Sequence, residues 1–367
     1  MNIFFNNSKI GLEEFDNNVK KLATVLRSKG LQAGGVVAIL LRNDVRQFEL
    51  IEACRYLEIS FVPLNWHATG SELQHILTDS GASVLIAHAD LASAAINELS
   101  EQVCILVYPT PENILVSYNI KKQEKPILKS RCEDMTTLLK NANPIATEIK
   151  PFRGVFSYTS GSTGRPKGIR RQVSQSQSDP YGVYEGLART LLKLEKGDRF
   201  YVSAPIYHSA PNALSLCCIA ARDADMYIEP KFDAEKFLAD IERYKITHTY
   251  IVPTMMIRLL KLPKEIKETY DISSLKFGIS SGSAWPADVK KAMIDWFGPI
   301  FYESYGASEI GFMTLISSEE AIKKPGSVGK ILSGGSIKIL DDDKNELAVG
   351  ESGSIYVYLP MFGDFAY

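Results

Sequence analysis

Ten consecutive residues, Thr159 to Gly168, combine hydroxyl side chains, glycines and one lysine in the stretch TSGSTGRPKG. Glycine permits left-handed backbone conformations, so several peptide N–H groups of such a loop can point toward one centre and bind an anion. The hydroxyl groups add hydrogen-bond donors, and Lys167 adds a mobile positive charge. Together these groups suit the oxygens of a polyphosphate, and a nucleotide is the expected ligand.

The loop is not a Walker A loop, because Pro166 stands where that motif has its second glycine and Gly168 where it has a hydroxyl residue. Composition alone also fits a surface hairpin of small polar residues. The following segment, GIRRQVSQSQ, has β-branched and polar residues but no amphipathic helical period. We therefore predict that the loop joins two strands and does not lead into a long helix.

Three further polar segments each follow an apolar strand pattern. They are PIYHSAPN (205–212) after RFYVSA, SSGSAWP (280–286) after LKFGI, and YESYGASE (302–309) after PIF. In open parallel sheets, ligands bind at the carboxyl ends of the strands. All three segments are therefore expected at positions where a ligand can bind.

Alternating strand and helix patterns must position these segments. Residues 13–29 place Phe15, Val19, Leu22 and Leu26 on one helical face, with Gly30 as the stop signal. Strands are expected at 36–41, in SFVPL and at 83–87, with intervening helices in VRQFELIEACRYL and after a capping box at Ser71 and Gln74. A second alternating run extends from near residue 181 to about 304, with strands in RFYVSA, DMYIE, THTYIV, LKFGIS and PIFYES.

This alternation predicts an α/β protein with two parallel-type sheets covered by helices. The final segment, GSIKILDDDKNELAVGESGSIYVYL, predicts strands joined by tight turns and hence the start of a small antiparallel β unit. We expect a first α/β subdomain with the phosphate loop in 1–180, a second in 181–324, and a partial β subdomain in 325–367. The lysine-rich stretch 119–150 carries little periodic pattern.

Composition indicates an ordinary globular protein. The 367 residues include 41 basic and 43 acidic side chains, so neither nucleic acid nor membrane is an expected partner. Neither a signal peptide nor an apolar run of membrane-spanning length stands out, and a cytoplasmic location is expected. The five cysteines lack metal-type spacing and are expected to be buried, reduced thiols: Cys54, Cys104, Cys132, Cys217 and Cys218.

Taken together, these motifs strongly resemble the adenylate-forming superfamily, which includes acyl-CoA synthetases, luciferases and the adenylation domains of peptide synthetases. The loop matches that family's phosphate loop, and Tyr305, Gly306, Ser308 and Glu309 match its Tyr-Gly-x-Thr/Ser-Glu signature. The segment YLEISFVPLNWHATGSELQHILTDSGASVLI also resembles the family's early part, so the resemblance covers essentially the whole chain.

The resemblance implies a role for each motif. The phosphate loop would hold the β- and γ-phosphates of ATP through Thr159, Ser160, Gly161, Ser162, Thr163, Gly164 and Lys167. The adenine would stack on Tyr305, beside a wall formed by Gly282, Ser283 and Ala284 and next to Gly306. Ser308 would contact the α-phosphate, and Glu309 would bind Mg²⁺.

His208, in the context PIYHSAP, resembles the family's gate beside the carboxylate and the α-phosphate. The other histidines are expected to be structural, namely His67, His75, His88 and His248. Trp285 could line an acyl pocket or cover the start of the next helix. Met255 and Met256 are expected in the core.

Family members continue to a ribose-binding aspartate, a hinge and a mobile C-terminal domain with a catalytic lysine. Asp364 lacks the Thr-Gly-Asp setting of the ribose aspartate and is not assigned that role. The resemblance therefore implies the large N-terminal part of an acyl-CoA synthetase without its C-terminal domain. We expect this chain to bind nucleotide but to be severely impaired in complete thioester formation.

The resemblance implies ATP-dependent activation of a carboxylic acid to an acyl-adenylate, with transfer to coenzyme A in the complete enzyme. One alternative is transfer to a carrier-protein thiol. However, the segment YHSAPNALSL lacks the aspartate with which amino-acid-activating domains bind the ammonium group of their substrate. A second alternative is a catalytically silent nucleotide-binding module.

Overall fold

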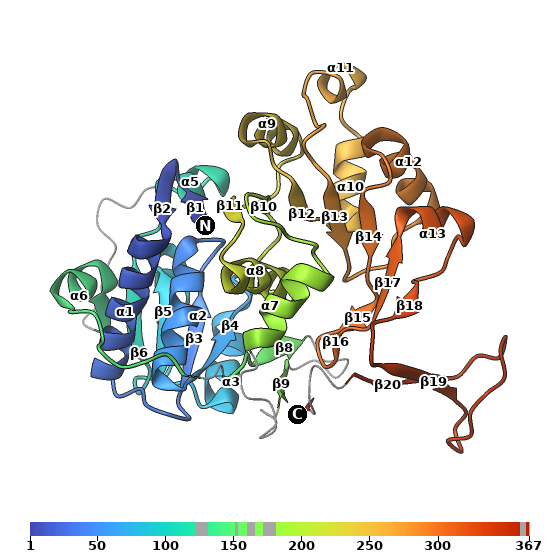
Figure 1. Ribbon diagram of the computed structural model, residues 1–367. Coiled ribbons are helices and arrows are strands. Elements are labelled where there is room, and N and C mark those ends of the chain that lie inside the picture. The colour runs from blue at the N-terminus through green and yellow to red at the C-terminus, as the bar shows by residue number, and fades with distance from the viewer. Residues whose placement is uncertain (122–130, 151–152, 160–165, 172–180, 360–364, 367) are drawn as a thin grey trace. The chain divides into compact units, whose positions relative to one another are not determined.

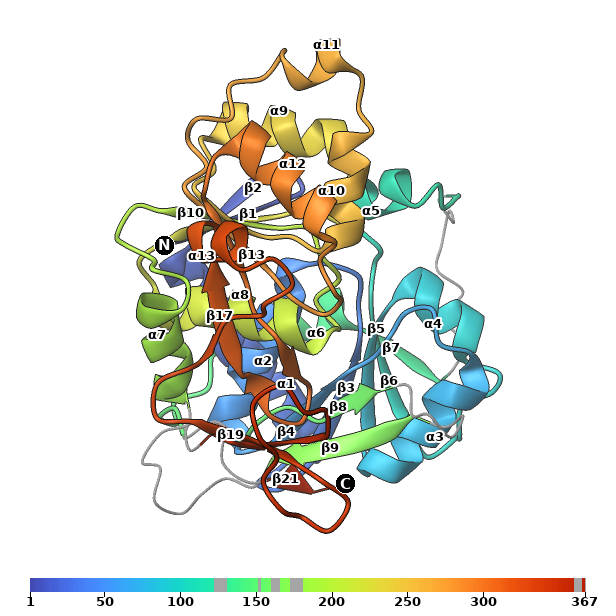
Figure 2. The same ribbon diagram turned by 90° about the vertical axis from the view of Figure 1, so that its right-hand side faces the viewer.

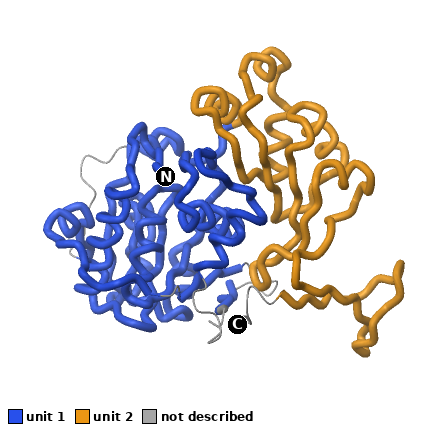
Figure 3. The backbone as a smooth tube through the Cα atoms, in the orientation of Figure 1, with its two compact units in different colours: residues 1–233, 366–367 blue, residues 234–365 orange. Residues whose placement is uncertain are grey.

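The computed structural model describes residues 1–121, 131–150, 153–159, 166–171, 181–359 and 365–366. The chain divides into two compact units, shown in different colours in Figure 3. Unit 1 comprises residues 1–233 with 366–367, and unit 2 comprises residues 234–365. Each unit is an α/β structure, and the two are described separately.

Unit 1 contains a sheet whose five strands are all parallel, as the alternating pattern predicts. In spatial order the strands are β4 (Ser60–Pro63), β3 (Val36–Leu40), β5 (Val84–His88), β6 (Cys104–Tyr108) and β7 (Cys132–Asp134). Strands β3 and β5 are buried along their whole length, which explains their continuous apolar sequences.

Helices cover both faces of this sheet. Figure 2 shows α3 (Gly70–Ser80) and α4 (Ala89–Ala95) on one face, and α1 (Leu12–Ser28) and α2 (Val45–Leu57) on the other. The predicted apolar face of α1 is confirmed, because Phe15, Val19, Leu22 and Leu26 are buried. Two shorter helices, α5 (Glu112–Ser117) and α6 (Met135–Asn141), complete this part of the unit.

A second group of strands in unit 1 has the order β10 (Arg199–Val202), β11 (Asp225–Ile228), β1 (Asn2–Phe5) and β2 (Ser8–Gly11). Strand β11 is parallel to both of its neighbours, and β2 returns antiparallel to β1. The associated helices are α7 (Tyr181–Thr190) and α8 (Ser209–Ala221).

Unit 2 contains a sheet of parallel strands with antiparallel strands at one side (Figure 1). The order is β12 (His248–Tyr250), β13 (Phe277–Ser280), β14 (Phe301–Glu303), β17 (Thr314–Ser317) and β18 (Lys330–Ile331). Strands β12 to β14 are parallel, whereas β17 is antiparallel to both β14 and β18. The helices of this unit are α9 (Ala234–Tyr244), α10 (Pro253–Leu260), α11 (Lys264–Lys267), α12 (Ala287–Phe297) and α13 (Ser318–Lys323).

The C-terminal part forms the predicted antiparallel structure. Strand β19 (Ser336–Leu340) pairs along its whole length with β20 (Ser354–Tyr358), and β21 (Phe365–Ala366) follows. The predicted fold class is therefore confirmed. The expected subdomain boundaries at residues 180 and 324 stay a prediction.

Two local expectations are wrong. Helix α3 begins after Thr69, and its capping box joins Thr69 to Glu72 instead of Ser71 to Gln74. Thr69 is the N-cap residue because its side chain accepts a hydrogen bond from the Glu72 amide. The Glu72 carboxylate in turn accepts from the Thr69 amide. Cys104 and Cys132 are only partly buried, because they lie at the starts of β6 and β7, whereas the other three thiols are buried.

In the described part of the chain, helices long and apolar enough to cross a membrane are absent.

Candidate active site

The phosphate-loop motif lies between two paired strands. Strand β8 (Ser157–Thr159) is antiparallel to β9 (Lys167–Arg171), and Thr159 is the pairing partner of Lys167. The prediction that this loop joins two strands is therefore confirmed. The predicted ligands Ser160, Gly161, Ser162, Thr163 and Gly164 lie outside the described residues.

Helix α3 binds strand β8 and the residue before β9 through side-chain hydrogen bonds. The Tyr158 hydroxyl donates to Oδ2 of Asp79, and Nε2 of His75 lies 3.3 Å from the carbonyl oxygen of Pro166. Burial is the main cause that raises the pKa of Tyr158, so the phenol stays protonated and remains a donor. The two strands that flank the motif are thus fixed to the same helix.

His208 stands in a turn between β10 and α8, at the N-cap position of that helix. Its backbone N–H binds the carbonyl oxygen of Pro205 over 3.2 Å, and its ring lies 4.2 Å from that of Tyr207. The Tyr207 ring in turn packs edge-on against Trp66, with 4.6 Å between centroids. Burial lowers the pKa of His208, so its imidazole is neutral near pH 7.

In unit 2, the segment Gly282–Ser283–Ala284 follows strand β13 and is exposed. Gly282 has a φ of +87°, which explains the glycine. The Tyr250 hydroxyl lies 3.3 Å from the carbonyl oxygen of Ser281, immediately before this turn. Burial raises the pKa of Tyr250 to about 12, so the phenol is available as a donor throughout the neutral range.

The second segment of unit 2 follows β14, the neighbour of β13. The carbonyl oxygen of Tyr305 accepts hydrogen bonds from the amides of Met313 and Thr314, while 40% of the residue's surface is exposed. Gly306 begins the short strand β15 (Gly306–Ala307), which pairs with β16 (Gly311–Phe312). A Cβ atom at residue 306 would lie 2.2 Å from the Gly311 carbonyl oxygen, so only glycine fits there.

Ser308 and Glu309 lie in the turn between β15 and β16 and are half-buried. Throughout the described residues, no group of three or more His, Cys, Asp or Glu side chains could hold a metal ion. A single carboxylate such as Glu309 fits Mg²⁺ only if phosphate and water oxygens supply its other ligands, which is how proteins commonly hold Mg²⁺ with nucleotides.

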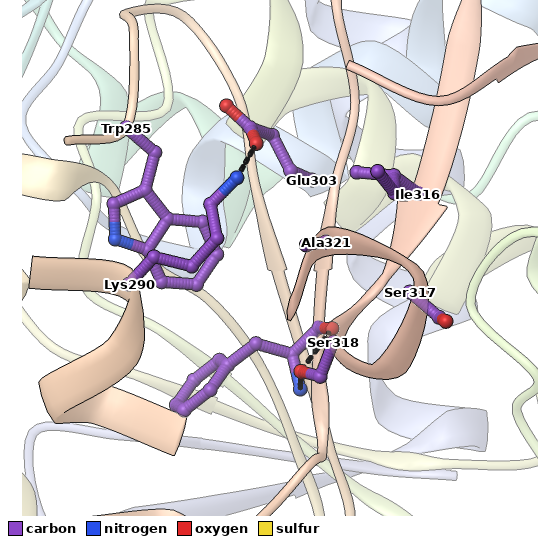
Figure 4. A pocket seen from close by; sticks show the side chains of 8 residues that line it. Trp285, Lys290, Glu303, Ile316, Ser317, Ser318 and Ala321 are labelled. Atoms are coloured by element: carbon purple, nitrogen blue, oxygen red, sulfur yellow. Dashed lines mark hydrogen bonds and ion pairs between the residues drawn. The ribbon is translucent and has the colours of Figure 1, made fainter. Parts of the chain in front are cut away.

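Trp285 belongs to a closely packed cluster next to these loops, shown in Figure 4. Its ring packs edge-on against Phe301, and the ammonium group of Lys290 lies 5.2 Å from the ring centroid. Lys290 of α12 also pairs with the carboxylate of Glu303 on β14. The side chains of this cluster leave no room for a water molecule, and the contact with Lys290 of α12 agrees with the alternative in which Trp285 covers the start of that helix.

Within each unit, the structure brings predicted site residues together. Thr159 and Lys167 are paired in unit 1. In unit 2 the two loops leave the same sheet edge, where the Ser304 amide binds the Ser280 carbonyl over 2.9 Å. Met256 is fully buried and Met255 nearly so, as expected of core residues.

Asn43, Tyr250 and His75 also hold these loops, although no motif of the sequence predicts that role. Asn43 carried a usable signal, because it lies three residues beyond the apolar strand β3, much as the other candidate segments follow their strands. Tyr250 and His75 carried none, since their partners are distant in sequence.

The AMP-binding enzyme family matches residues 2–362, and the chain belongs to that family. Among curated proteins, it is 29% identical to a feruloyl-CoA synthase of Amycolatopsis sp over 354 residues, which are 95% of this chain and 64% of that protein. It is 26% identical to an indoleacetate–CoA ligase of Aromatoleum aromaticum, covering 93% of this chain and 64% of the relative. The chain thus spans about 64% of the length of these relatives.

Solved structures share the fold. The anthranilate CoA ligase AuaEII in complex with anthranoyl-AMP matches with a TM-score of 0.82 at 22% identity, over 98% of this chain and 67% of that one. ATP-bound MatB from Rhodopseudomonas palustris matches with a TM-score of 0.77 at 24% identity, over 97% and 66%. The predicted resemblance to adenylate-forming enzymes is therefore confirmed.

Proposed function

We propose that this chain provides the site for ATP-dependent activation of a carboxylic acid to an acyl-adenylate, with transfer to coenzyme A in the complete enzyme. The observation that carries the proposal is the pairing of Thr159 with Lys167 across β8 and β9 at the two ends of the phosphate-loop motif. This strand–loop–strand arrangement agrees with the family assignment and differs from a Walker A loop, which leads into a helix.

In this proposal, unit 1 supplies the phosphate and acid contacts. Lys167 and the hydroxyl and amide groups of residues 159–164 bind the β- and γ-phosphates. His208 lies beside the acid and the α-phosphate, and its neutral imidazole donates one hydrogen bond to an oxygen there. The exposed position of Lys167 supports its assignment to a ligand.

Unit 2 supplies the nucleoside contacts. The exposed ring of Tyr305 stacks on adenine, and the turn formed by Gly282, Ser283 and Ala284 lies beside the base. Ser308 contacts the α-phosphate, and Glu309 would hold Mg²⁺. When bound, the metal ion supplies positive charge that offsets the repulsion between the phosphates and an incoming carboxylate.

The first reaction forms a bond between a carboxylate oxygen and the α-phosphorus of ATP and breaks the bond to pyrophosphate, which leaves. In the second, the coenzyme A thiolate attacks the acyl carbon, AMP leaves with the electron pair of the anhydride bond, and the thiol proton goes to solvent. The chain's residues act by positioning the reactants and by neutralising charge, as in phosphoryl transfers.

Coenzyme A is the preferred acceptor and an acid without an α-amino group the preferred substrate. Helix α8 (Ser209–Ala221) follows His208 and contains no aspartate or glutamate that could bind a substrate ammonium group. The names of relatives suggest the first acids to test, namely ferulate, indoleacetate, 2-succinylbenzoate and a long-chain fatty acid.

The test is acid-dependent exchange of labelled pyrophosphate into ATP, combined with capture of the activated acyl group by hydroxylamine. We expect exchange with at least one acid, and we expect Lys167→Ala to abolish it. Coenzyme A and a carrier protein are then compared as acceptors, using this chain and a version extended to the length of its relatives.

A silent nucleotide-binding module is the second candidate. ATP binding without exchange, for the extended version and for every acid, would contradict the enzymatic proposal and favour this module.

A further inference from the structure

Asn43 stands between strand β3 and helix α2, and its side chain is completely buried, with 0% of its surface exposed. Its amide nitrogen Nδ2 donates to two carbonyl oxygens, those of Ala204 and Glu229, each over 3.0 Å. Its Oδ1 accepts from the backbone N–H of Ile206, also over 3.0 Å. One side chain thus binds three backbone groups of the segments that follow β10 and β11.

These backbone groups lie just beyond the paired residues of β10 and β11. The ladder between β10 and β11 ends where the Glu229 amide binds the Val202 carbonyl over 2.8 Å. Beyond that point the chain turns toward His208, while Ala204 and Ile206 remain buried. Buried peptide groups require partners, and Asn43 binds three of them close to the end of the ladder.

The neighbours of Asn43 fix its own position. Asp44 caps α2 by accepting from the Arg46 amide, and its other carboxylate oxygen lies 3.1 Å from Nε2 of His88. The Arg42 amide donates to Nδ1 of the same imidazole over 3.2 Å. His88 therefore carries its proton on Nε2 and donates it to Asp44, which leaves residues 42–44 little freedom.

We propose that Asn43 is a positioning residue that sets the place of His208 through the backbone of residues 204–206. The inference rests on the proposed role of His208 in adenylation. Only Tyr207 separates Ile206 from His208, and the His208 amide donates to the Pro205 carbonyl oxygen over 3.2 Å, so a shift of residues 204–206 moves the imidazole. The edge-on contact between Trp66 and Tyr207 also supports this turn.

Asn43→Asp tests this inference, because aspartate has nearly the same shape but cannot donate to Ala204 and Glu229. Arg131→Met is the matched control, since Arg131 also binds three backbone carbonyls of unit 1, those of Ile96, Leu99 and Ser100, on another loop. Both variants lose buried contacts to the backbone, but only the first touches the turn before His208.

The first measurement follows the His208 imidazole by NMR through a pH titration and needs no substrate. His208→Gln identifies the signal among the five histidines. Because burial lowers the pKa of His208, we expect Asn43→Asp to raise that pKa toward the ordinary value of 6.5. Arg131→Met should leave it unchanged. An unchanged titration in Asn43→Asp would overturn the proposal.

The second measurement is the adenylation rate with the best acid of the pyrophosphate-exchange panel. A misplaced gate residue should lower kcat about tenfold to a hundredfold and leave the KM for ATP within about twofold. Equal losses in Asn43→Asp and the control would show a general structural effect and overturn the proposal. If the parent chain lacks exchange activity, the proposed adenylation function is contradicted. The NMR result still decides whether Asn43 positions His208.

Hydrogen exchange of the unaltered chain provides a measurement that does not depend on the folding of a variant. The Ile206 amide donates to a buried side chain, so it should exchange as slowly as the amides of β10. Rapid exchange at Ile206 would show that its hydrogen bond to Asn43 does not hold the turn, and this result would also overturn the proposal.

Discussion

The hydroxyl of Tyr158 donates a hydrogen bond to Oδ2 of Asp79 over 2.6 Å and thereby joins strand β8 to helix α3. The ring of the same tyrosine lies against Gly168 on β9, where an added Cβ would come within 2.8 Å of the ring carbon Cζ. Tyr158 therefore both fixes strand β8 to helix α3 and packs against Gly168 of the paired strand β9.

Gly168→Ala should therefore displace the Tyr158 ring, break its bond to Asp79 and weaken ATP binding several-fold, with a loss of about 1 kcal/mol in stability. In a Tyr158→Ala background, the ring is absent and Gly168→Ala should cost much less. A double-mutant cycle of melting temperatures and ATP dissociation constants measures this coupling. Strictly additive effects would show that the contact has no role in binding.

Lys167→Ala should weaken ATP binding by about 1.5 to 3 kcal/mol, the range for a hydrogen bond to a charged group, because the proposed partner is a phosphate. The melting temperature should remain nearly unchanged, since the side chain is exposed. Calorimetric titration with ATP measures the effect. Lys9→Ala removes another exposed strand lysine of unit 1 and is the control. Equal ATP affinity in Lys167→Ala and the parent would remove Lys167 from the site.

The buried carboxyl of Glu49 predicts a pH dependence of stability. Burial, partly offset by Arg46, raises the pKa of Glu49 from 4.5 to about 7, although Asn18 donates to the carboxylate. The native state therefore binds the proton more tightly than the unfolded state, and stability falls as pH rises from about 4.5 to about 7. The difference in pKa corresponds to roughly 3 kcal/mol.

Glu49→Gln should abolish this part of the pH dependence and raise the melting temperature at pH 8 relative to the parent. Thermal unfolding between pH 5 and about 8 measures both effects. Glu13→Gln, at an exposed position of α1, should leave the slope unchanged. A parent chain whose stability rises through this range would show that other groups outweigh Glu49.

Glu303→Gln should destabilise unit 2 by about 3 to 5 kcal/mol, because it leaves the ammonium group of Lys290 buried without its partner. The double variant Lys290→Met with Glu303→Leu should be more stable than the Gln variant. Lys291→Met is the matched control, since it breaks an exposed pair with Asp295 on the same helix and should cost under about 1 kcal/mol. Urea unfolding gives these free energies, and equal losses in Glu303→Gln and the control would contradict the buried-pair explanation.

Much of the fold could be predicted because the central strands are buried on both faces. Strand β3 consists of Val, Ala, Ile and Leu residues, and α2 coincides with the segment VRQFELIEACRYL. Strand β7 and helix α6 could not be predicted within 119–150, because only Met135 of α6 is buried and no apolar period results. The hairpin of β1 and β2 is also short, and its strand character depends on pairing of β1 with β11.

Site residues with a local signal could be predicted, whereas the residues that hold them could not. Lys167 and Tyr305 belong to motifs that the chain carries intact. The bond of His75 to Pro166 joins residues 91 positions apart, and the bond of Asn43 to Ala204 joins residues 161 apart. Such contacts depend on the tertiary fold, which no local period encodes.

The distribution of indole rings gives each unit its own fluorescence signal. Trp66 is the only tryptophan in residues 1–233, whereas Trp285 and Trp296 both belong to unit 2. Replacing the latter two by phenylalanine would leave one emitter beside Tyr207, in the turn that contains His208. Quenching or a wavelength shift of that emission would then report on the turn that contains His208. The rate at which the emission changes on mixing would separate ligand binding from later steps.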